Sequence, residues 1–532
     1  MPVLKSKVDI SSETFKANRA GHLAAIAALN EQLELVRAGG GEAYRNRHHA
    51  RGKLLVHERI ELLLDRDAPF LELSSLAAWG TDFTVGASII TGIGVVEGVE
   101  CMIIAHDPTV KGGTANPYSL KKNLRALQIA RENRLPILYL VESGGADLPT
   151  QAEIFVPSGN VFRELTQLSS IGITSIALVF GNSTAGGAYV PGMCDYAVLV
   201  DQGAKVFLGG PPLVKMATGE EANDEDLGGA DMHTRVSGVG DHFAVDELDA
   251  IRIGRQIVRD LSWRKLGRGP SEAADAPLYD PEEILGIASA DFRVPYDPRE
   301  ILARVVDGSR FSEYKPRYGS SIVTGWASVH GYPVGILANA RGVLFSEEAQ
   351  KATEFILLAN QSDTPLLFLH NTTGYMVGTE YEQKGIIKDG AKMINAVANS
   401  DVPHISINMS ATFGAGNYGM SGRAFDPRFM FAWPNAKLAV MGAAQLAGVL
   451  SIVAKQSAES TGRPFDQAAD DARRIAIEEQ IEREAHPFFI SSRLYDDGVI
   501  DPRDTRTILG LSLSAAHSAP IEGRRGFGVF RM

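Results

Sequence analysis

The chain has 532 residues, of which 45% are hydrophobic and 22% are charged, as in an ordinary globular protein. This length exceeds a single hydrophobic core and predicts two domains. The formal net charge of −12 argues against a nucleic-acid-binding surface, and no apolar run reaches the roughly 18 residues of a membrane helix.

The first predicted element is an amphipathic helix between residues 23 and 36, which the run Gly39-Gly40-Gly41 ends. Strand-like segments separated by glycines follow from Phe70 to Asp107. A strand–helix–strand rhythm then continues to about Leu266. Alternating strands and helices of this kind predict an α/β domain in the first half.

The second half of the chain repeats the first. A shift of 229 positions aligns Pro136–Leu140 with Pro365–Leu369 and Ser175–Phe180 with His404–Met409. Both matched segments are short and apolar, as expected of buried parallel strands. The repeat indicates an internal duplication, with two α/β domains of the same design.

A stretch rich in Pro, Ala and Asp separates the two halves between residues 267 and 297 and predicts a linker. We therefore place the domains at residues 1–280 and 281–532. A charged helix is predicted from Gln467 to Ala485. It has no counterpart in the first half, so we expect a peripheral addition.

A glycine-rich turn follows the same strand in each half. The strand at Ile176–Phe180 leads to Gly186-Gly187, and the strand at Ile405–Met409 leads to Ala415-Gly416. Small residues let a ligand approach the backbone, and successive N–H groups at a strand-to-helix turn bind anions. Facing a carbonyl that becomes an enolate, each N–H donor contributes about 3–4 kcal/mol in the transition state. A glycine pair can also serve only to turn the chain, but recurrence at the matched position favours binding.

Two other motifs suggest different chemistry and are less well supported. Gly181–Ala185 resembles the nucleophile elbow of a serine hydrolase around Ser183, with the last glycine replaced by alanine. No histidine has the supporting context of a base, and Ser183 corresponds to Thr412 in the repeat. Gly92–Gly98 resembles a dinucleotide fingerprint but has the wrong spacing and no following helix. The histidines available as a base are His233, His242, His370 and His404.

Several long motifs, in order along nearly the whole chain, resemble the carboxyltransferase (β) subunit of biotin-dependent acyl-CoA carboxylases. They are Arg51–Leu54, Asp107–Gly113, Glu142–Ala146, Thr184–Pro191, Gly210–Lys215, Phe413–Met420, Ala432–Ala436 and Gly498–Pro502. The resemblance implies two tandem crotonase-like β-β-α domains of the ClpP/crotonase superfamily. It also implies a homo-hexameric core, with each active site between the N-domain of one protomer and the C-domain of another.

Within this family, three segments are most similar to methylcrotonoyl-CoA carboxylase β subunits. They are Ala188–Pro191, Gly416–Met420 and Phe527–Met532. This similarity implies carboxylation of 3-methylcrotonyl-CoA to 3-methylglutaconyl-CoA, a reaction of leucine catabolism. The segment Phe155–Phe162 departs from the pattern, because it is shorter and lacks the usual aromatic residues. Geranyl-CoA or another branched or long acyl-CoA therefore stays open.

The resemblance also assigns roles at the two turns. The N–H groups of Gly186 and Gly187 would hold the thioester enolate, and those of Ala415 and Gly416 the ureido oxygen of biotin. No side-chain base is then required, because a biotin nitrogen removes the acyl proton. Further acyl-CoA-binding residues would be Arg51, Lys53, Lys111, Gly112, Gly113, Gly144, Gly145, Ala146, Ala185, Ala188 and Tyr189. Further biotin-binding residues would be Thr373, Gly374, Phe413, Gly414 and Asn417.

The three cations among these residues would neutralise phosphates of coenzyme A, although each also fits an ordinary surface charge. A biotin carboxylase and carrier (α) subunit is expected as partner, because the chain has neither a Met-Lys-Met biotinylation site nor a P-loop. Two alternatives are a biotin-dependent acyl-CoA decarboxylase subunit and a non-catalytic CoA-binding scaffold. The small residues in both turns argue against the scaffold.

Cysteine content and the N-terminus bear on the environment of the protein. Cys101 and Cys194 are the only cysteines, which excludes a four-cysteine zinc site and a disulfide framework. We expect no metal in this chain. The N-terminus has no apolar leader segment, and acidic residues interrupt its early basic residues. We therefore expect a cytoplasmic location.

Overall fold

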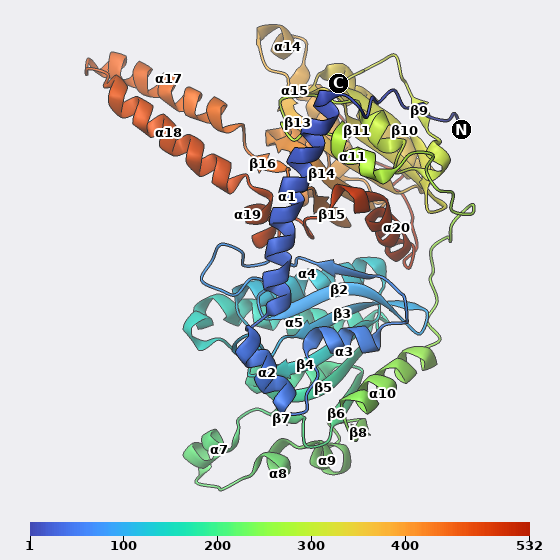
Figure 1. The fold of residues 1–532 in the computed structure, drawn as a ribbon, viewed down its shortest axis with the longest axis vertical. Coiled ribbons are helices and arrows are strands. Elements are labelled where there is room, and N and C mark those ends of the chain that lie inside the picture. The colour runs from blue at the N-terminus through green and yellow to red at the C-terminus, as the bar shows by residue number, and fades with distance from the viewer.

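The computed structural model describes residues 1–532 and consists of two α/β units stacked along the long axis (Figure 1). The first sheet has the order β1-β2-β3-β4-β5-β6-β8, with β7 paired to β5, and it is parallel from β3 onwards. Its strands are β1 (Phe70–Leu73), β2 (Ile89–Val96), β3 (Val99–His106), β4 (Ile137–Ser143), β5 (Ser175–Thr184), β6 (Tyr196–Val200), β7 (Lys205–Phe207) and β8 (His242–Ala244).

The second sheet has the same design. Its order is β15-β14-β13-β11-β10-β9, with β12 paired to β13 and β16 paired to β14. Its strands are β9 (Ser312–Tyr314), β10 (Ile322–Val329), β11 (Tyr332–Asn339), β12 (Gly342–Leu344), β13 (Leu366–Tyr375), β14 (His404–Phe413), β15 (Phe429–Ala432) and β16 (Lys437–Ala439). The predicted α/β class is therefore confirmed in both halves.

The duplication extends to the pairing of individual residues. In the β4–β5 and β13–β14 ladders, every matched position is separated by 229 residues. The same irregularity interrupts both ladders just before the glycine turns. The matched pairs are Ile137–Ser175 with Leu366–His404, and Ser143–Ser183 with Thr372–Thr412. A one-residue slip would move every side chain to the other face, so this agreement fixes both turns in the same orientation.

Helices cover both faces of the sheets. Those of the first half are α1 (Glu13–Ala38), α2 (Glu42–Ala50), α3 (Val56–Leu63), α4 (Pro117–Asn133), α5 (Gln151–Ser170), α6 (Tyr189–Met193), α7 (Pro211–Thr218), α8 (Asp224–Gly228), α9 (Ala230–Met232) and α10 (Glu247–Asp260). Those of the second half are α11 (Ile284–Ile287), α12 (Pro298–Leu302), α13 (Ser346–Gln361), α14 (Thr379–Gln383), α15 (Ile386–Ala398), α16 (Gly414–Gly419), α17 (Ala443–Thr461), α18 (Gln467–Glu484), α19 (Pro487–Ser492) and α20 (Thr505–Ala516).

The two halves share one hydrophobic core. A cluster of 55 buried residues includes one face of each sheet, and clusters of 20 and 15 residues fill the outer faces. Strand β4 shows the alternation behind this arrangement: Tyr139 faces the shared core, whereas Leu138 and Leu140 face α3 and α10. Because the strands are buried on both faces, their apolar runs are continuous.

The N-terminal helix α1 crosses from one unit to the other, as Figure 1 shows in blue. The amide of Asn18 donates to the carbonyl oxygen of Gly286, and the ring of His22 bonds to that of Ala288, both at 3.1 Å. The predicted boundary at residue 280 falls between the two sheets. Nevertheless, α1 packs mainly on the second unit and ties it to the first.

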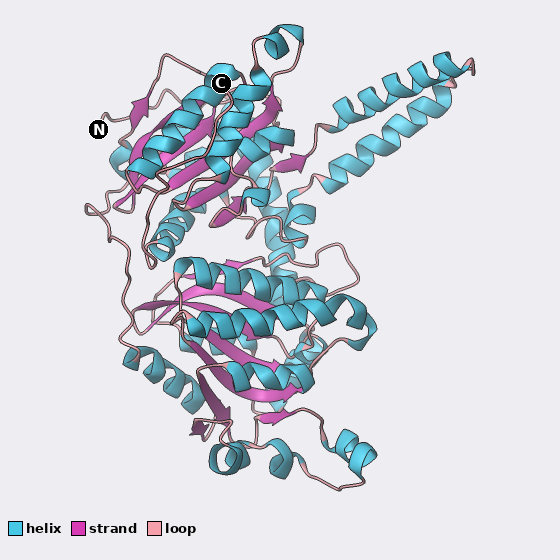
Figure 2. Cartoon of the chain, turned by 180° about the vertical axis from the view of Figure 1, so that it is seen from behind, coloured by secondary structure: helices cyan, strands magenta, loops and turns pink.

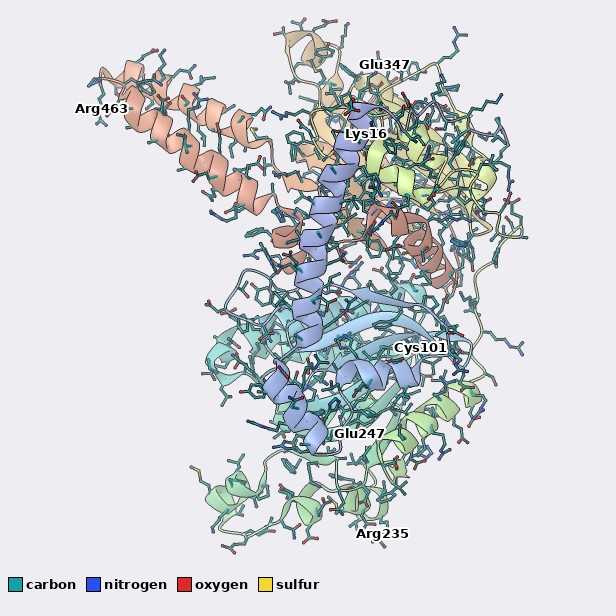
Figure 3. All side chains as sticks on the ribbon, viewed as in Figure 1. Lys16, Cys101, Arg235, Glu247, Glu347 and Arg463 are labelled. Atoms are coloured by element: carbon teal, nitrogen blue, oxygen red, sulfur yellow. The ribbon has the colours of Figure 1, made fainter.

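The predicted charged helix is α18, which pairs with α17 as a long hairpin that projects from the second unit (Figure 2). Arg463, in the turn of this hairpin, lies far from the body of the molecule (Figure 3). Apolar side chains stay exposed along α17, notably Val449, Ile452 and Val453. None of the helices is both long and apolar enough to cross a membrane.

Candidate functional site

The two predicted turns are the starts of short helices. In the first half, a 3-10 helix (η3, Ala185–Ala188) follows β5 directly, and in the second half α16 follows β14. Neither start has a side-chain cap. The leading N–H groups of a helix lack partners within it and sit at the positive end of its dipole. Gly186 and Gly187 occupy these positions in η3, and Ala415 and Gly416 occupy them in α16.

The first turn has open space in front of its backbone. A Cβ atom added to Gly186 would meet only the ring of Phe162 at 3.7 Å, and one added to Gly187 would meet only the Ser183 hydroxyl at 3.9 Å. Ala185, the first residue of this turn, adopts a left-handed conformation with φ of 55°. A pocket of about 110 Å³ lies against it. Its lining includes His106, Leu120, Ser143, Gly145, Ala146, Ser158, Val161, Phe162, Gly186, Gly187 and Val190.

Two loops predicted to bind acyl-CoA come together beside this turn. The N–H of Gly144 donates to the carbonyl of Gly112 at 2.9 Å, and the N–H of Ala115 donates to that of Gly145 at 2.8 Å. Gly113 must be glycine, because its φ is 70° and a Cβ there would lie 2.3 Å from the Glu142 carbonyl. The loop from Lys111 to Gly113 and the loop from Gly144 to Ala146 therefore form one wall. Ala188 ends η3 and Tyr189 begins α6, and the Tyr189 ring lies 5.7 Å from that of Phe162.

The three predicted phosphate-binding cations differ in their surroundings. Arg51 is exposed just after α2. Lys111 is also exposed, with its Nζ 3.9 Å from an oxygen of Asp147. Lys53, in contrast, is paired with Glu142 at 2.5 Å and donates to the Phe180 carbonyl at 3.0 Å. Arg51 and Lys111 are therefore free to meet an anion, whereas Lys53 is engaged within the protein.

A buried charge network that sequence reasoning missed lies behind the first turn. Glu142, at the end of β4, forms an ion pair with Arg59 at 2.8 Å, and Arg59 also pairs with Glu247 at 2.7 Å. Burial by itself would raise the pKa of Glu142, but Arg59 and Lys53 hold that pKa below its usual value. The one signal in the sequence was a carboxylate at the end of an apolar strand.

The second turn packs more tightly. A Cβ atom on Gly416 would lie 2.9 Å from Cα of Gly374 and 3.0 Å from the Thr372 hydroxyl, so only glycine fits. Gly374 itself has a φ of 126°. The hydroxyl of neighbouring Thr373 donates to the Gly342 carbonyl at 3.0 Å. Gly374 is thus packed against the turn, and Thr373, next to it in the chain, is held by Gly342. Their role in binding biotin stays a prediction.

Ala415 lies between two hollows in the second unit. One, of about 510 Å³, is mainly apolar and is lined by residues of α16, β16, α18 and α19, including Thr412, Gly414, Ala415, Asn417, Tyr418, Leu438, Val440, Ile481, Phe489 and Tyr495. The other, of about 340 Å³, lies along α15 and includes Tyr375, Val377, Ile386, Ile387 and Ile394. Phe413 lines neither hollow and packs edge-on against Phe292, with the ring centres 5.6 Å apart.

Within one chain, the two turns do not open into the same cavity. The pocket at Gly186 and Gly187 shares no lining residue with either hollow beside Ala415. Of the predicted residues, Gly145, Ala146, Gly186 and Gly187 line the first pocket, and Gly414, Ala415 and Asn417 line the larger hollow. Arg51, Lys53, Lys111 and Phe413 line none of the three.

The arrangement of Ser183 excludes the serine-hydrolase hypothesis. Its side chain is fully buried, and its hydroxyl donates to the Gly187 carbonyl at 2.9 Å. None of the four candidate histidines forms a hydrogen bond with it. His233, His370 and His404 are engaged elsewhere, by Val206 and Ser237, by Thr412, and by Ser400 and Ser421 respectively.

Comparison with known proteins agrees with this geometry. The carboxyl transferase domain model matches residues 47–529. The chain is 64% identical over 530 residues to the "Probable biotin-dependent acyl-coenzyme A carboxylase beta2 subunit" of Mycobacterium tuberculosis, covering 100% of both chains. It is 48% identical to the mitochondrial methylcrotonoyl-CoA carboxylase beta chain of Dictyostelium discoideum, covering 100% of this chain and 91% of the relative.

A solved structure extends the likeness to the fold. The geranyl-CoA carboxylase beta subunit of P. aeruginosa superposes with a TM-score of 0.90 at 44% identity, covering 99% of each chain. The prediction of two tandem crotonase-like domains is thereby confirmed. The chain belongs to the carboxyl transferase domain family, as a carboxyltransferase (beta) subunit of the biotin-dependent acyl-CoA carboxylases.

Proposed function

We propose that this chain transfers a carboxyl group from carboxylated biotin, carried by an α partner subunit, to 3-methylcrotonyl-CoA, giving 3-methylglutaconyl-CoA. The observation that carries the proposal is the pair of helix starts in identical sheet register, each offering main-chain N–H groups beside a pocket. Carboxyl transfer develops negative charge on one oxygen of each reactant. Two matched sets of donors fit that requirement.

On the acyl side, Gly186 and Gly187 would donate to the thioester oxygen as it gains negative charge. The charge is delocalised through the double bond of the acyl group, so the proton leaves the γ carbon. The lining of this pocket contains no carboxylate, and its one histidine, His106, is neutral because burial lowers its pKa to about 4. The chain thus positions and stabilises the acyl group, without an evident side-chain base.

On the biotin side, Ala415 and Gly416 would donate to the ureido oxygen. The residues present fit that group, because the first turn of α16 is uncapped and borders a hollow with an apolar lining. Carboxylated biotin, when bound, supplies the activated carboxyl group and a nitrogen that accepts the proton. Gly414, Thr373 and Gly374 shape the wall around the turn and let the ring approach the backbone.

We further propose that a complete active site forms between two protomers of a hexameric core. Support comes from the separation of the two pockets within one chain, and from the apolar side chains exposed on the projecting hairpin. Exposed apolar surface of this kind is typical of protein–protein contacts. The α partner would bring biotin to the site, as the names of the beta-subunit relatives suggest.

Geranyl-CoA is the second candidate substrate, and two observations favour it. The pocket wall on α5 has the small side chain Ser158 next to Gly159, where an added Cβ would meet no atom within 4 Å. In addition, a geranyl-CoA carboxylase beta subunit has nearly the same fold. A longer acyl chain would find no bulky side chain at Ser158 and Gly159, although Phe162 one turn further along α5 also lines the pocket.

The test is an acyl-CoA panel with the purified enzyme, including its biotinylated partner. Bicarbonate fixation is measured with 3-methylcrotonyl-, geranyl-, propionyl- and acetyl-CoA. We expect the highest kcat/KM with 3-methylcrotonyl-CoA. A kcat/KM at least tenfold higher with geranyl-CoA would make geranyl-CoA the substrate and leave the proposed carboxyl transfer unchanged. Absence of fixation with every acyl-CoA, from an assembled and fully biotinylated enzyme, would contradict the proposal.

A further inference from the structure

A chain of three buried polar side chains lies directly beneath the biotin-side turn. His370 is in β13, Thr412 is near the end of β14, and Asn417 is in α16. The Thr412 hydroxyl oxygen is 3.0 Å from Nδ1 of His370 and 2.9 Å from Nδ2 of Asn417. Their exposures are 0%, 0% and 8% respectively, so solvent does not compete for these hydrogen bonds. Thr412 therefore links the sheet interior to the helix that carries the turn.

The direction of each hydrogen bond follows from the groups involved. The amide nitrogen of Asn417 can only donate, so the Thr412 oxygen accepts from it. The Thr412 hydroxyl proton then needs an acceptor, and Nδ1 of His370 is the group in range. Burial keeps the imidazole neutral by lowering the pKa of His370 to about 3, and Nδ1 accepts this proton in the neutral tautomer that carries its hydrogen on Nε2. The chain thus runs from Asn417 through Thr412 to His370.

The acyl-side turn has no such chain of hydrogen bonds. The positions 229 residues earlier are Val141, Ser183 and Ala188, and two of these three have no polar side-chain atom. Ser183 donates instead to the Gly187 carbonyl within its own turn. The fold by itself therefore does not require these hydrogen bonds. They occur only in the half that we propose to bind biotin.

Asn417 is also held from its other side. The N–H of Gly422 donates to the Asn417 carbonyl at 2.9 Å, and a Cβ on Gly422 would lie 1.9 Å from the Asn417 side-chain oxygen. Thr412 and Asn417 both line the hollow beside Ala415. Any change in the rotamer of Asn417 would therefore alter the wall of that hollow and the first turn of α16.

We propose that His370 is a positioning residue for the biotin side, fixing Thr412 and Asn417 and, through them, the N–H groups of Ala415 and Gly416. His370 touches no reactant and acts through its hydrogen bond alone. This inference rests on the proposed carboxyl transfer. His370, Thr412 and Asn417 would then lie behind the turn and set the geometry of its N–H groups.

The experiment compares His370→Leu and Thr412→Val with His370→Asn and Thr412→Ser in the complete enzyme. The first two remove the hydrogen bond with little change in volume, whereas the other two retain an acceptor or a hydroxyl. Carboxylation of 3-methylcrotonyl-CoA and carboxyl transfer to free biotin are both measured. We expect His370→Leu and Thr412→Val to lower kcat about tenfold and to raise the KM for free biotin, with the acyl-CoA KM within twofold of wild type. His370→Asn and Thr412→Ser should recover most of the loss.

Controls separate positioning from a general loss of packing. Val141→Ala, at the duplicated position, should alter the acyl-CoA KM and leave the KM for free biotin unchanged. The kcat of the double variant His370→Leu/Thr412→Val should be no lower than that of the less active single variant, because both substitutions break the same chain of hydrogen bonds. Three results would each overturn the inference: wild-type kinetics for both single variants, a loss in the double variant equal to the sum of the two single losses, or failure of His370→Asn to recover activity. A wild-type enzyme inactive with every acyl-CoA would instead contradict the proposed function itself.

Discussion

The main-chain N–H of Ala415 is one of the two donors that we assign to the ureido oxygen of biotin, and a single substitution can remove it. Ala415→Pro deletes its N–H, and proline is tolerated in the first turn of a helix. We expect kcat to fall by roughly 10²–10³, as on removal of an oxyanion-hole donor. Acyl-CoA binding should stay nearly unchanged, as measured by calorimetry with the assembled enzyme. Ala415→Gly keeps the N–H and is the matched control; unchanged turnover in Ala415→Pro would refute the role of this turn.

Arg51 and Lys111 are exposed cations without a strong partner, in contrast to Lys53. We expect Arg51→Gln and Lys111→Gln each to raise the acyl-CoA KM several-fold with little change in kcat, because a lost phosphate contact weakens ground-state and transition-state binding equally. The increase should shrink at high salt. Lys215→Gln alters an equally exposed cation, paired with Glu221, and is the control. Equal KM values in all three variants would contradict the assignment.

Asp496 is fully buried, and neither of its carboxylate oxygens has a hydrogen-bond partner. Burial raises the pKa of this carboxyl from 3.8 to about 7. A raised folded-state pKa contributes stability that is present below about pH 4 and is lost as the pH rises through 7. The loss amounts to at most about 4 kcal/mol, at 1.36 kcal/mol per pH unit.

Asp496→Asn should therefore stabilise the protein at pH 8 and change it little at pH 4.5. Thermal unfolding at the two pH values measures the difference, with exposed Asp67→Asn as the control. A melting temperature that is no higher than wild type at pH 8 would show that the Asp496 carboxylate is stabilised in the folded protein.

At the scale of elements, an ion pair joins α4 of the first unit to the segment before β15 and to the loop after α19. Arg125 donates to both oxygens of Asp497, at 2.8 and 3.0 Å, and Arg423 donates to the same carboxylate at 2.7 Å. Burial would raise the pKa of Asp497, but the two guanidinium groups lower it to about 2. The stability from this depressed pKa is present above pH 4 and is lost as the pH falls through 2.

Arg125→Met should lower the free energy of unfolding by about 3 kcal/mol at pH 7, because one side of a fully buried ion pair is removed. Denaturant unfolding measures this loss. Lys384→Met, which breaks an exposed pair with Glu380, should leave stability almost unchanged. Equal effects of the two substitutions would mean that the contact between the units does not depend on Arg125.

The duplicated elements show how well a pattern predicts local structure. The strands Ile137–Ser143 and Leu366–Tyr375, and the turns after β5 and β14, were predictable because buried strands and small-residue turns have distinct sequence signals. The side chains behind the turns were not. Lys122 and Lys351, also 229 positions apart, are both buried and donate to strand carbonyls, yet a lysine in the sequence normally indicates an exposed charge.

At the scale of the whole molecule, the two units share a single core although the sequence shows two separate domains. Helix α1, near the N-terminus, packs on the second unit through contacts about 270 positions distant in sequence. Such contacts carry no periodic signal, so residue-by-residue patterns do not predict them. The two turns line separate pockets in one chain, and no local pattern indicated this; only the family resemblance implied it, by placing each active site between two protomers.

Local patterns in the sequence were enough to establish the α/β class, the duplication, the two glycine turns and the family to which the motifs belong, because each depends on local spacing and on residues that few other structures tolerate. The tertiary structure decided the rest. It paired Lys53 with Glu142, placed Ser183 away from any base, and set His370 beneath the turn of Ala415 and Gly416. These outcomes depend on which distant residues meet in the folded chain, where burial and hydrogen bonding change the chemistry of each group.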